Sequence, residues 1–83
     1  MIYINRNNRN SFIDKNGKHH RVVGPAYFSD KHKQWWLNGE LHRLDGPAII
    51  DENYVEWHIN NKEYTKMGYY NKLKEMGFFY DKN

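Results

Sequence analysis

The chain has 83 residues, enough for a single domain (1–83), and it contains no cysteine, which excludes disulfide staples and thiolate metal sites. Aromatic residues make up 17% of the chain although hydrophobic residues reach only 39%, so we expect rings to supply much of the buried surface. Lysine and arginine outnumber aspartate and glutamate by only 13 to 10 and are scattered, which argues against a dedicated DNA-binding face.

The first residues, 1–15, are expected to form capping strands. Neither they nor any later stretch forms an apolar run of signal-peptide or membrane-spanning length. We therefore expect a cytoplasmic protein without membrane contact. The high asparagine and lysine content is typical of AT-rich genomes such as those of many phages, in which case the compartment would be the host cytoplasm.

Two consecutive 22-residue segments, 16–37 and 38–59, align without a gap. A third copy follows and diverges, with Thr65 at the arginine position and Gly68 at the position of the second glycine. Divergent end copies are typical of stacked arrays, whose terminal units have one neighbour only. We therefore predict a repeat sheet over residues 16–65. The identical pairs are Asn16 and Asn38, Gly17 and Gly39, His20 and His42, Arg21 and Arg43, Gly24 and Gly46, Pro25 and Pro47, Ala26 and Ala48, and Trp35 and Trp57.

Each segment carries two turn signals. Asn16-Gly17 and Asn38-Gly39 favour two-residue type I′ turns, because both positions of such a turn need a positive φ. Gly-Pro-Ala is the second signal, and a short apolar strand and a polar loop follow it in each copy. The expected fold is mainly β, an antiparallel β-meander with a short C-terminal α-helix. In the first copy we expect a strand over 26–29 and a loop over 30–33. In the second copy we expect a strand over 48–51 and a loop over 52–53.

Pairing across two-residue turns predicts the two faces of the sheet. It sets Ile13 opposite His20, Trp36 opposite Leu41, Trp35 opposite His42, and Trp57 opposite Tyr64. The face with Ile13, Trp35 and Trp57 holds similar residues in every copy, so we expect it to be the core. The other face varies between copies, so we expect it to contact a binding partner. Arg21 and Arg43 are expected on this face, beyond Trp36. The candidate contact residues are Arg21, Arg43, Trp36, Leu41, His58 and Tyr27.

The pattern becomes helical after residue 65, and a helix with a tail is expected over residues 66–83. Thr65 is the predicted N-cap and Gly77 the predicted C′ residue. Phe78, Phe79 and Tyr80 are expected to fold back onto the sheet or to form an edge strand. The predicted apolar stripe of the helix comprises Met67, Tyr69, Tyr70, Leu73 and Met76.

The string W-x-N-G-x-x-H-R-x-x-G-P-A, from Trp36 to Ala48, resembles the MORN-like repeat variants of small phage and large-DNA-virus proteins. The resemblance covers residues 12–65 and implies a non-enzymatic β-sheet scaffold that contacts proteins or membranes. Arg21 and Arg43 stand where the main MORN pattern has glycine, and Gly-Pro-Ala is inserted, which argues against lipid binding. The helical tail has no counterpart in that family.

No cofactor, metal or catalytic group is expected. The adjacent His19 and His20 project to opposite sides of a strand, and no HxH or HxxxH pair is present. The repeat-equivalent His20 and His42 fit scaffold roles better than catalysis, and the sequence suggests no nucleophile beside a base.

The leading functional hypothesis is a non-catalytic protein-binding module, such as a phage-encoded inhibitor of a host enzyme or defence complex. The alternative is sequestration of nucleic acid or a signalling nucleotide by Arg21, Arg43 and neighbouring rings. A purely structural role, in which each arginine lies along a tryptophan and pairs with Asp14, Asp45 or Asp51, is also open, as is a structural virion component. Edge strands make homo-oligomers possible.

Overall fold

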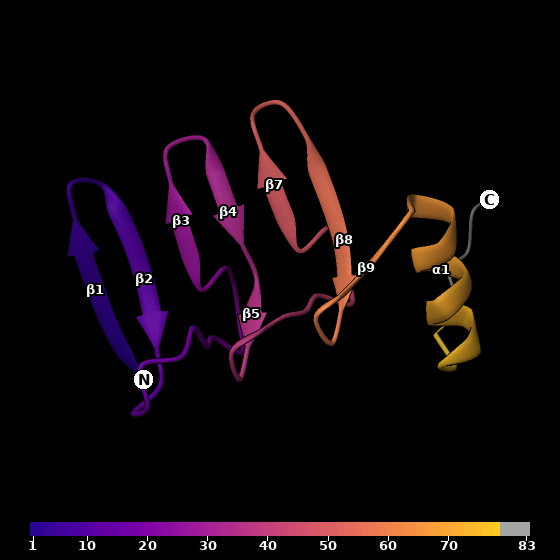
Figure 1. The fold of residues 1–83 in the computed structure, drawn as a ribbon, viewed down its shortest axis with the longest axis horizontal. Coiled ribbons are helices and arrows are strands. Elements are labelled where there is room, and N and C mark those ends of the chain that lie inside the picture. Colours follow the sequence, from indigo (N-terminus) through magenta and orange to yellow (C-terminus); the bar gives the residue numbers. More distant parts are fainter. Residues whose placement is uncertain (79–83) are drawn as a thin grey trace.

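The computed structural model describes residues 1–78 and contains one antiparallel sheet with a helix at its C-terminal end (Figure 1). The sheet has the order β1-β2-β3-β4-β7-β8-β9, and the ribbon of β5 and β6 is separate from it. The predicted mainly-β meander with one short C-terminal helix is confirmed, whereas the 22-residue repeat stays a prediction. The elements are β1 Ile2–Arg6, β2 Arg9–Ile13, β3 Tyr27–Ser29, β4 His32–Gln34, β5 Trp36–Leu37, β6 Glu40–Leu41, β7 Ile49–Asp51, β8 Val55–Ile59, β9 Lys62–Tyr64 and α1 Lys66–Glu75.

Two-residue turns in which both residues have a left-handed backbone reverse the chain at Asn38-Gly39 and at Asn60-Asn61. Asn38 and Gly39 have φ of 52° and 79°, so they form the predicted two-residue turn, which tolerates asparagine and glycine best. The register across it pairs Trp36 with Leu41, as predicted. The predicted pairing of Trp57 with Tyr64 is also confirmed, across a turn of two left-handed asparagines.

The corner at Gly17 differs from the prediction because it is one residue longer. Gly17 N–H donates to the Asp14 carbonyl at 3.0 Å, and Gly17 alone is left-handed there, with φ of 81°. The Asp14 carboxylate accepts from the Lys18 and Asn16 amides, at 3.0 and 2.8 Å, and the hydrogen bond from Lys18 is the main cause that lowers the pKa of Asp14. Ile13 consequently pairs with His19, and the predicted pairing with His20 is wrong.

This shift by one residue puts Phe12, and not Ile13, on the same face as Trp35 and Trp57. His20 N–H donates to the Phe12 carbonyl at 3.0 Å, just as His42 N–H donates to the Trp35 carbonyl at 3.1 Å. We call the face with Phe12, Trp35 and Trp57 the helix-side face, and the face with Tyr27, Gln34, Trp36 and Glu56 the open face. The prediction that Trp35 and Trp57 share a face is confirmed. Lys33 and Val55 both pair with Ile50, so they lie on one face, and each is two residues before one of these tryptophans.

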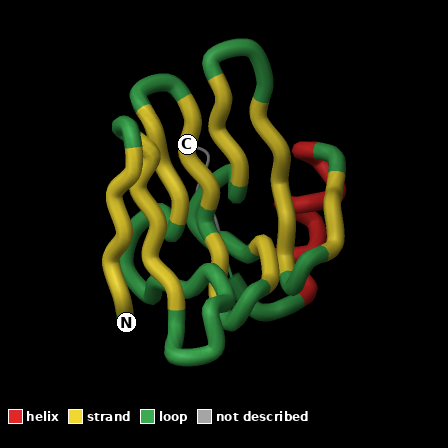
Figure 2. Tube along the Cα trace, turned by 60° about the vertical axis from the view of Figure 1, so that its left-hand side comes forward, coloured by secondary structure: helices red, strands yellow, loops and turns green. Residues whose placement is uncertain are grey.

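The helix packs against β8 and β9 (Figure 2) and completes the core there. Ile59, Tyr69 and Leu73 form the buried cluster, with Trp57 and Tyr64 against it. The predicted stripe is wrong in part, because Met67 and Met76 are exposed. A helix at the end of a sheet buries a narrow strip, and the i, i+4 pair of Tyr69 and Leu73 fills it.

Both predicted helix ends are confirmed. Thr65 Oγ1 accepts from Gly68 N–H at 3.0 Å, as an N-cap does. At the other end Gly77 is left-handed, and Phe78 N–H donates to the Leu73 carbonyl at 2.8 Å, which is the pattern of a Schellman motif. Gly68 lies inside the helix, so the diverged third copy does not form a Gly-Pro loop there. Phe78 is exposed and outside any strand, while Phe79 and Tyr80 lie outside the described residues.

The polar loop predicted over 30–33 is shorter, because β4 already begins at His32, which pairs with Ser29. The bend at 52–53 is as predicted, and Asp51 N–H closes it by donating to the Tyr54 carbonyl at 2.8 Å. Within residues 1–78, no helix has the length and apolar character needed to cross a bilayer.

Candidate functional site

Twice the chain leaves the sheet as a loop on its way to the next strand. We call residues 21–25 the first loop and residues 43–47 the second loop. Each begins with an arginine whose N–H donates to the neighbouring strand: Arg21 to the Trp36 carbonyl at 3.1 Å, and Arg43 to the His58 carbonyl at 3.2 Å. Each arginine also closes its own loop, since Nη1 donates to the carbonyl of Pro25 or Pro47 at 3.1 and 3.0 Å. The two loops therefore share the bond from the arginine to the proline carbonyl.

The arginine side chains lie flat on aromatic rings of the helix-side face. The guanidinium carbon of Arg21 is 4.0 Å from the Phe12 ring centre, and that of Arg43 is 3.8 Å from the Trp35 ring centre. Arg43 Nε also donates to Asp45 Oδ1 at 2.9 Å. The prediction that both arginines lie beyond Trp36 on its face is wrong, because the alternation of strand side chains ends where the loops begin. Arg43 matches the predicted structural role, with Trp35 and Asp45 as its partners, whereas the ring under Arg21 is Phe12 and not the predicted tryptophan.

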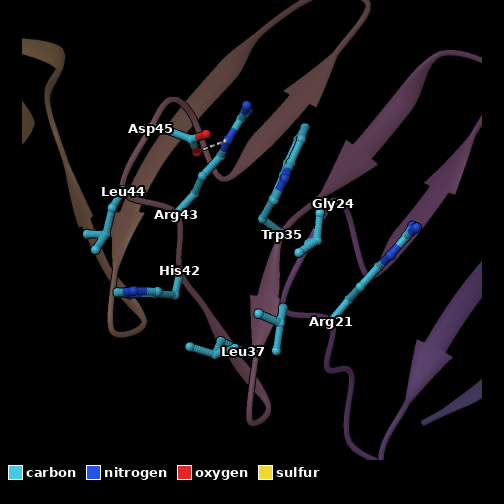
Figure 3. Close-up of a pocket in the computed structure, with 10 residues that line it drawn as sticks. Arg21, Gly24, Trp35, Leu37, His42, Arg43, Leu44 and Asp45 are labelled. Carbon is cyan, nitrogen blue, oxygen red and sulfur yellow. Dashed lines mark hydrogen bonds and ion pairs between the residues drawn. The ribbon is translucent and has the colours of Figure 1, made fainter.

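A pocket of about 450 Å³ lies between the two loops on the helix-side face (Figure 3). Trp35 and Leu37 line it from the strand side, and Leu44 lines it from the second loop. The first loop contributes Val22 and Val23, whose exposed fractions are 77% and 79%. The pocket is within the range of roughly 300–1,000 Å³ that binding sites usually have. Sequence reasoning missed it, and the only available signal was the apolar Val-Val pair in a loop.

The open face carries a chain of hydrogen bonds that begins at Trp36. Trp36 Nε1 donates to Gln34 Oε1 at 2.8 Å, and Gln34 Nε2 lies 2.8 Å from His32 Nε2. His32 Nδ1 lies 2.7 Å from Asp51 Oδ1. Gln34 Nε2 can only donate, so His32 Nε2 is the acceptor of that bond. The ring proton of His32 is therefore on Nδ1, and this N–H donates to Asp51 Oδ1. This hydrogen bond is the main cause that lowers the pKa of Asp51.

Two further rings pack beside this chain. The ring centres of His19 and Trp36 are 5.2 Å apart, and those of His19 and Tyr27 are 6.2 Å apart in an edge-to-face arrangement. Leu41, paired opposite Trp36, is half-buried, and its N–H donates to Asn61 Oδ1 at 3.3 Å. Tyr27, Trp36 and Leu41 thus lie on the open face, and the shared side of Trp36 and Leu41 is as predicted.

His58, the remaining predicted contact residue, is only 7% exposed, so it is not available to a partner. Its Nε2 is 2.9 Å from Glu56 Oε1. Glu56, His58 and Glu63 place three ligand atoms within 4.8 Å of one another, a grouping that the sequence search for histidine pairs missed. The available signal was Glu-x-His on one strand, which puts both side chains on one face. His58 Nε2 is already engaged by Glu56, and Glu63 is an exposed carboxylate beside this pair.

His20 and His42 cap the turns that follow them. His20 Nδ1 accepts from Asn38 N–H at 2.9 Å, and His42 Nδ1 accepts from Asn60 N–H at 3.0 Å. Both bonds need an unprotonated Nδ1. Burial lowers the pKa of His42 below its ordinary value of 6.5, despite the nearby Glu40 carboxylate.

Lowering the pH should therefore destabilise the fold through His42. Its pKa in the folded chain lies below that of the unfolded chain, so the unfolded state takes up the proton first. The contribution is fully present above the unfolded pKa and is lost as the pH falls below it. Urea unfolding at about pH 7.5 and about pH 5.5 measures the slope, and the His42→Gln variant should show a smaller one. An equal slope in both proteins would contradict this role.

No protein-family model, curated protein or solved structure matches the chain. The geometry thus defines two candidate surfaces. One is the part of the open face that carries Tyr27, Trp36 and Leu41. The other is the pocket of the helix-side face, where Arg21 and Arg43 shape the walls.

Proposed function

We propose that the chain is a non-catalytic protein-binding module that docks its partner at the pocket between the two loops. The observation that carries this is the exposure of Val22 and Val23, neighbouring apolar side chains on a loop held by Arg21. Exposed apolar side chains beside a concave apolar site are typical of protein interaction surfaces. A loop fixed by hydrogen bonds loses little conformational freedom on binding, which favours affinity.

The engagement of the histidines supports the non-catalytic assignment. His32 bonds to Asp51 and Gln34, and His42 accepts from the Asn60 amide. In the described part of the chain, no serine or threonine hydroxyl bonds to a histidine, the arrangement that activates a hydroxyl nucleophile. His32 and His42 are thus held by hydrogen bonds within the fold.

The arginine contacts favour protein binding over sequestration of nucleic acid or a nucleotide. Each guanidinium already has a ring and a carbonyl as partners, and that of Arg43 also has Asp45. These contacts hold each guanidinium against its ring, so a phosphate could reach only the N–H groups that they leave unused. The MORN-like resemblance supports a more specific form, a phage-encoded protein that inhibits a host enzyme or defence complex stoichiometrically.

Replacing Val22 by aspartate should abolish capture of the partner. The side chain is exposed, so the fold tolerates the change, but binding would bury a charge in an apolar site and affinity should fall at least about tenfold. Affinity capture from bacterial lysate, with quantitative mass spectrometry, measures the loss. Met67→Asp on the helix, at an exposed fraction of 76%, is the matched control and should capture normally.

Two outcomes would contradict the proposal. A partner captured equally by Val22→Asp and by the parent protein would place the docking surface elsewhere. Recovery of nucleic acid alone, lost as the salt concentration rises, would favour the alternative function.

A further inference from the structure

Tyr69 shows what fits beside a loop of this type. Its side chain is fully buried, and its hydroxyl donates to the Arg43 carbonyl at 2.6 Å and accepts from Gly46 N–H at 3.3 Å. Its ring centre lies 6.4 Å from that of Trp57. The helix thus inserts a phenol between the second loop and the strand that carries Trp57.

The open pocket is built from the residues that lie 22 positions before those around Tyr69. In the loop, Arg21 and Gly24 stand for Arg43 and Gly46, whose backbone groups bond to the Tyr69 hydroxyl. Other residues that line the pocket also have a counterpart 22 positions later, next to Tyr69. The pairs are Val22 and Leu44, Trp35 and Trp57, Leu37 and Ile59, and His42 and Tyr64.

The polar groups that bond to Tyr69 have free counterparts in the first loop. Within residues 1–78, the Arg21 carbonyl and Gly24 N–H form no hydrogen bond, although both loops are closed by the same bond from the arginine to the proline carbonyl. A residue that buries this pocket without supplying a hydroxyl would leave both groups unpaired. A tyrosine hydroxyl can accept and donate at once, as Tyr69 does.

We propose that the pocket between the loops receives a tyrosine side chain from a helix of the partner protein. This rests on the proposed function and names the side chain that is recognised. Leu73, four residues after Tyr69, fills the space next to it in the closed site, so the partner helix would carry a leucine at the same spacing against Val22. The two sites differ at one wall, where Arg43 covers Trp35 and Thr65 occupies the corresponding position at Trp57. An entering phenol therefore also meets a cation, which favours its electron-rich ring.

The test is a titration of the full-length protein, followed by NMR. The probes are an alanine-lysine-glutamate helix with tyrosine and leucine four residues apart, the same peptide with phenylalanine for tyrosine, and free p-cresol. We expect the tyrosine peptide to shift the Gly24 amide and the Val22 methyl groups, and the phenylalanine peptide to bind roughly three- to tenfold more weakly. Val22→Asp should remove the response, with an unchanged spectrum elsewhere.

Each other outcome would overturn the inference. Equal affinity of the two peptides would mean that the hydroxyl is not recognised. Binding of p-cresol without binding of the peptide would assign the pocket to a free phenol. No response to any probe, while capture of the partner still depends on Val22, would leave the protein-binding function in place and exclude the tyrosine.

Discussion

Replacing Tyr69 by alanine is expected to lower the free energy of unfolding by about 3–5 kcal/mol, the usual cost of truncating a buried aromatic side chain. The substitution empties the cluster with Ile59 and Leu73 and also leaves the Arg43 carbonyl and Gly46 N–H without the hydroxyl. Small domains have stabilities of roughly 5–15 kcal/mol, so much of the chain should unfold at lower urea concentration. Urea unfolding followed by tryptophan fluorescence measures the change.

Two further variants divide this loss between packing and hydrogen bonding. Tyr69→Phe keeps most of the ring and should cost about 1–3 kcal/mol, because two buried backbone groups lose their partner. Met67→Ala, on the exposed side of the same helix, should change stability by less than about 0.5 kcal/mol. If Tyr69→Ala cost no more than Met67→Ala, the helix would not be part of the core.

The meander could be predicted because its turns are specified locally. Asn38 and Gly39 both adopt a positive φ and form a two-residue turn, which sets the reversal and the pairing of Trp36 with Leu41. The ends of the helix were predictable for the same reason, since Thr65 and Gly77 act on the nearest turn only. In each case the cause and the effect lie within a few residues.

The face of each side chain was harder to predict, because it depends on a count of residues. The Asp14 carboxylate bonds to the Asn16 and Lys18 amides and favours a corner with one extra residue. That residue moves Ile13 to the opposite face and puts Phe12 beneath Arg21. Side chains of a strand alternate between the two faces of the sheet, so an error of one residue in the register places every side chain on the wrong face.

The pocket could not be predicted, because the loops that form it follow no period. From Arg21 and Arg43 onward the chain leaves the sheet, so the alternation that placed both arginines on the face of Trp36 no longer applies. The buried side of the helix also depends on where the helix meets β8 and β9, and this selects Tyr69 over Met67. Such choices are made by packing between distant segments.

Replacing Gly46 by alanine should cost about 1–5 kcal/mol, because two effects add. Gly46 has φ of 155°, a conformation that residues with a Cβ rarely adopt, at a cost of about 1–3 kcal/mol. A Cβ at this position would lie 3.0 Å from Cζ of Arg43, so the guanidinium must shift by a few tenths of an ångström over Trp35, and part of the stacking on the indole, about 0.5–2 kcal/mol in full, is lost. Thermal or urea unfolding reports the sum.

Gly17→Ala separates the two effects. Gly17 is also left-handed, with φ of 81°, but a Cβ there would meet no atom within 4 Å, so strain alone should cost about 1–2 kcal/mol. The remainder of the loss at Gly46 should depend on Arg43. In a double-mutant cycle, Arg43→Ala should therefore cost less in the Gly46→Ala background than in the parent protein. Additive losses would mean that the guanidinium gives way freely, and its stacking on Trp35 would then contribute little to holding the second loop.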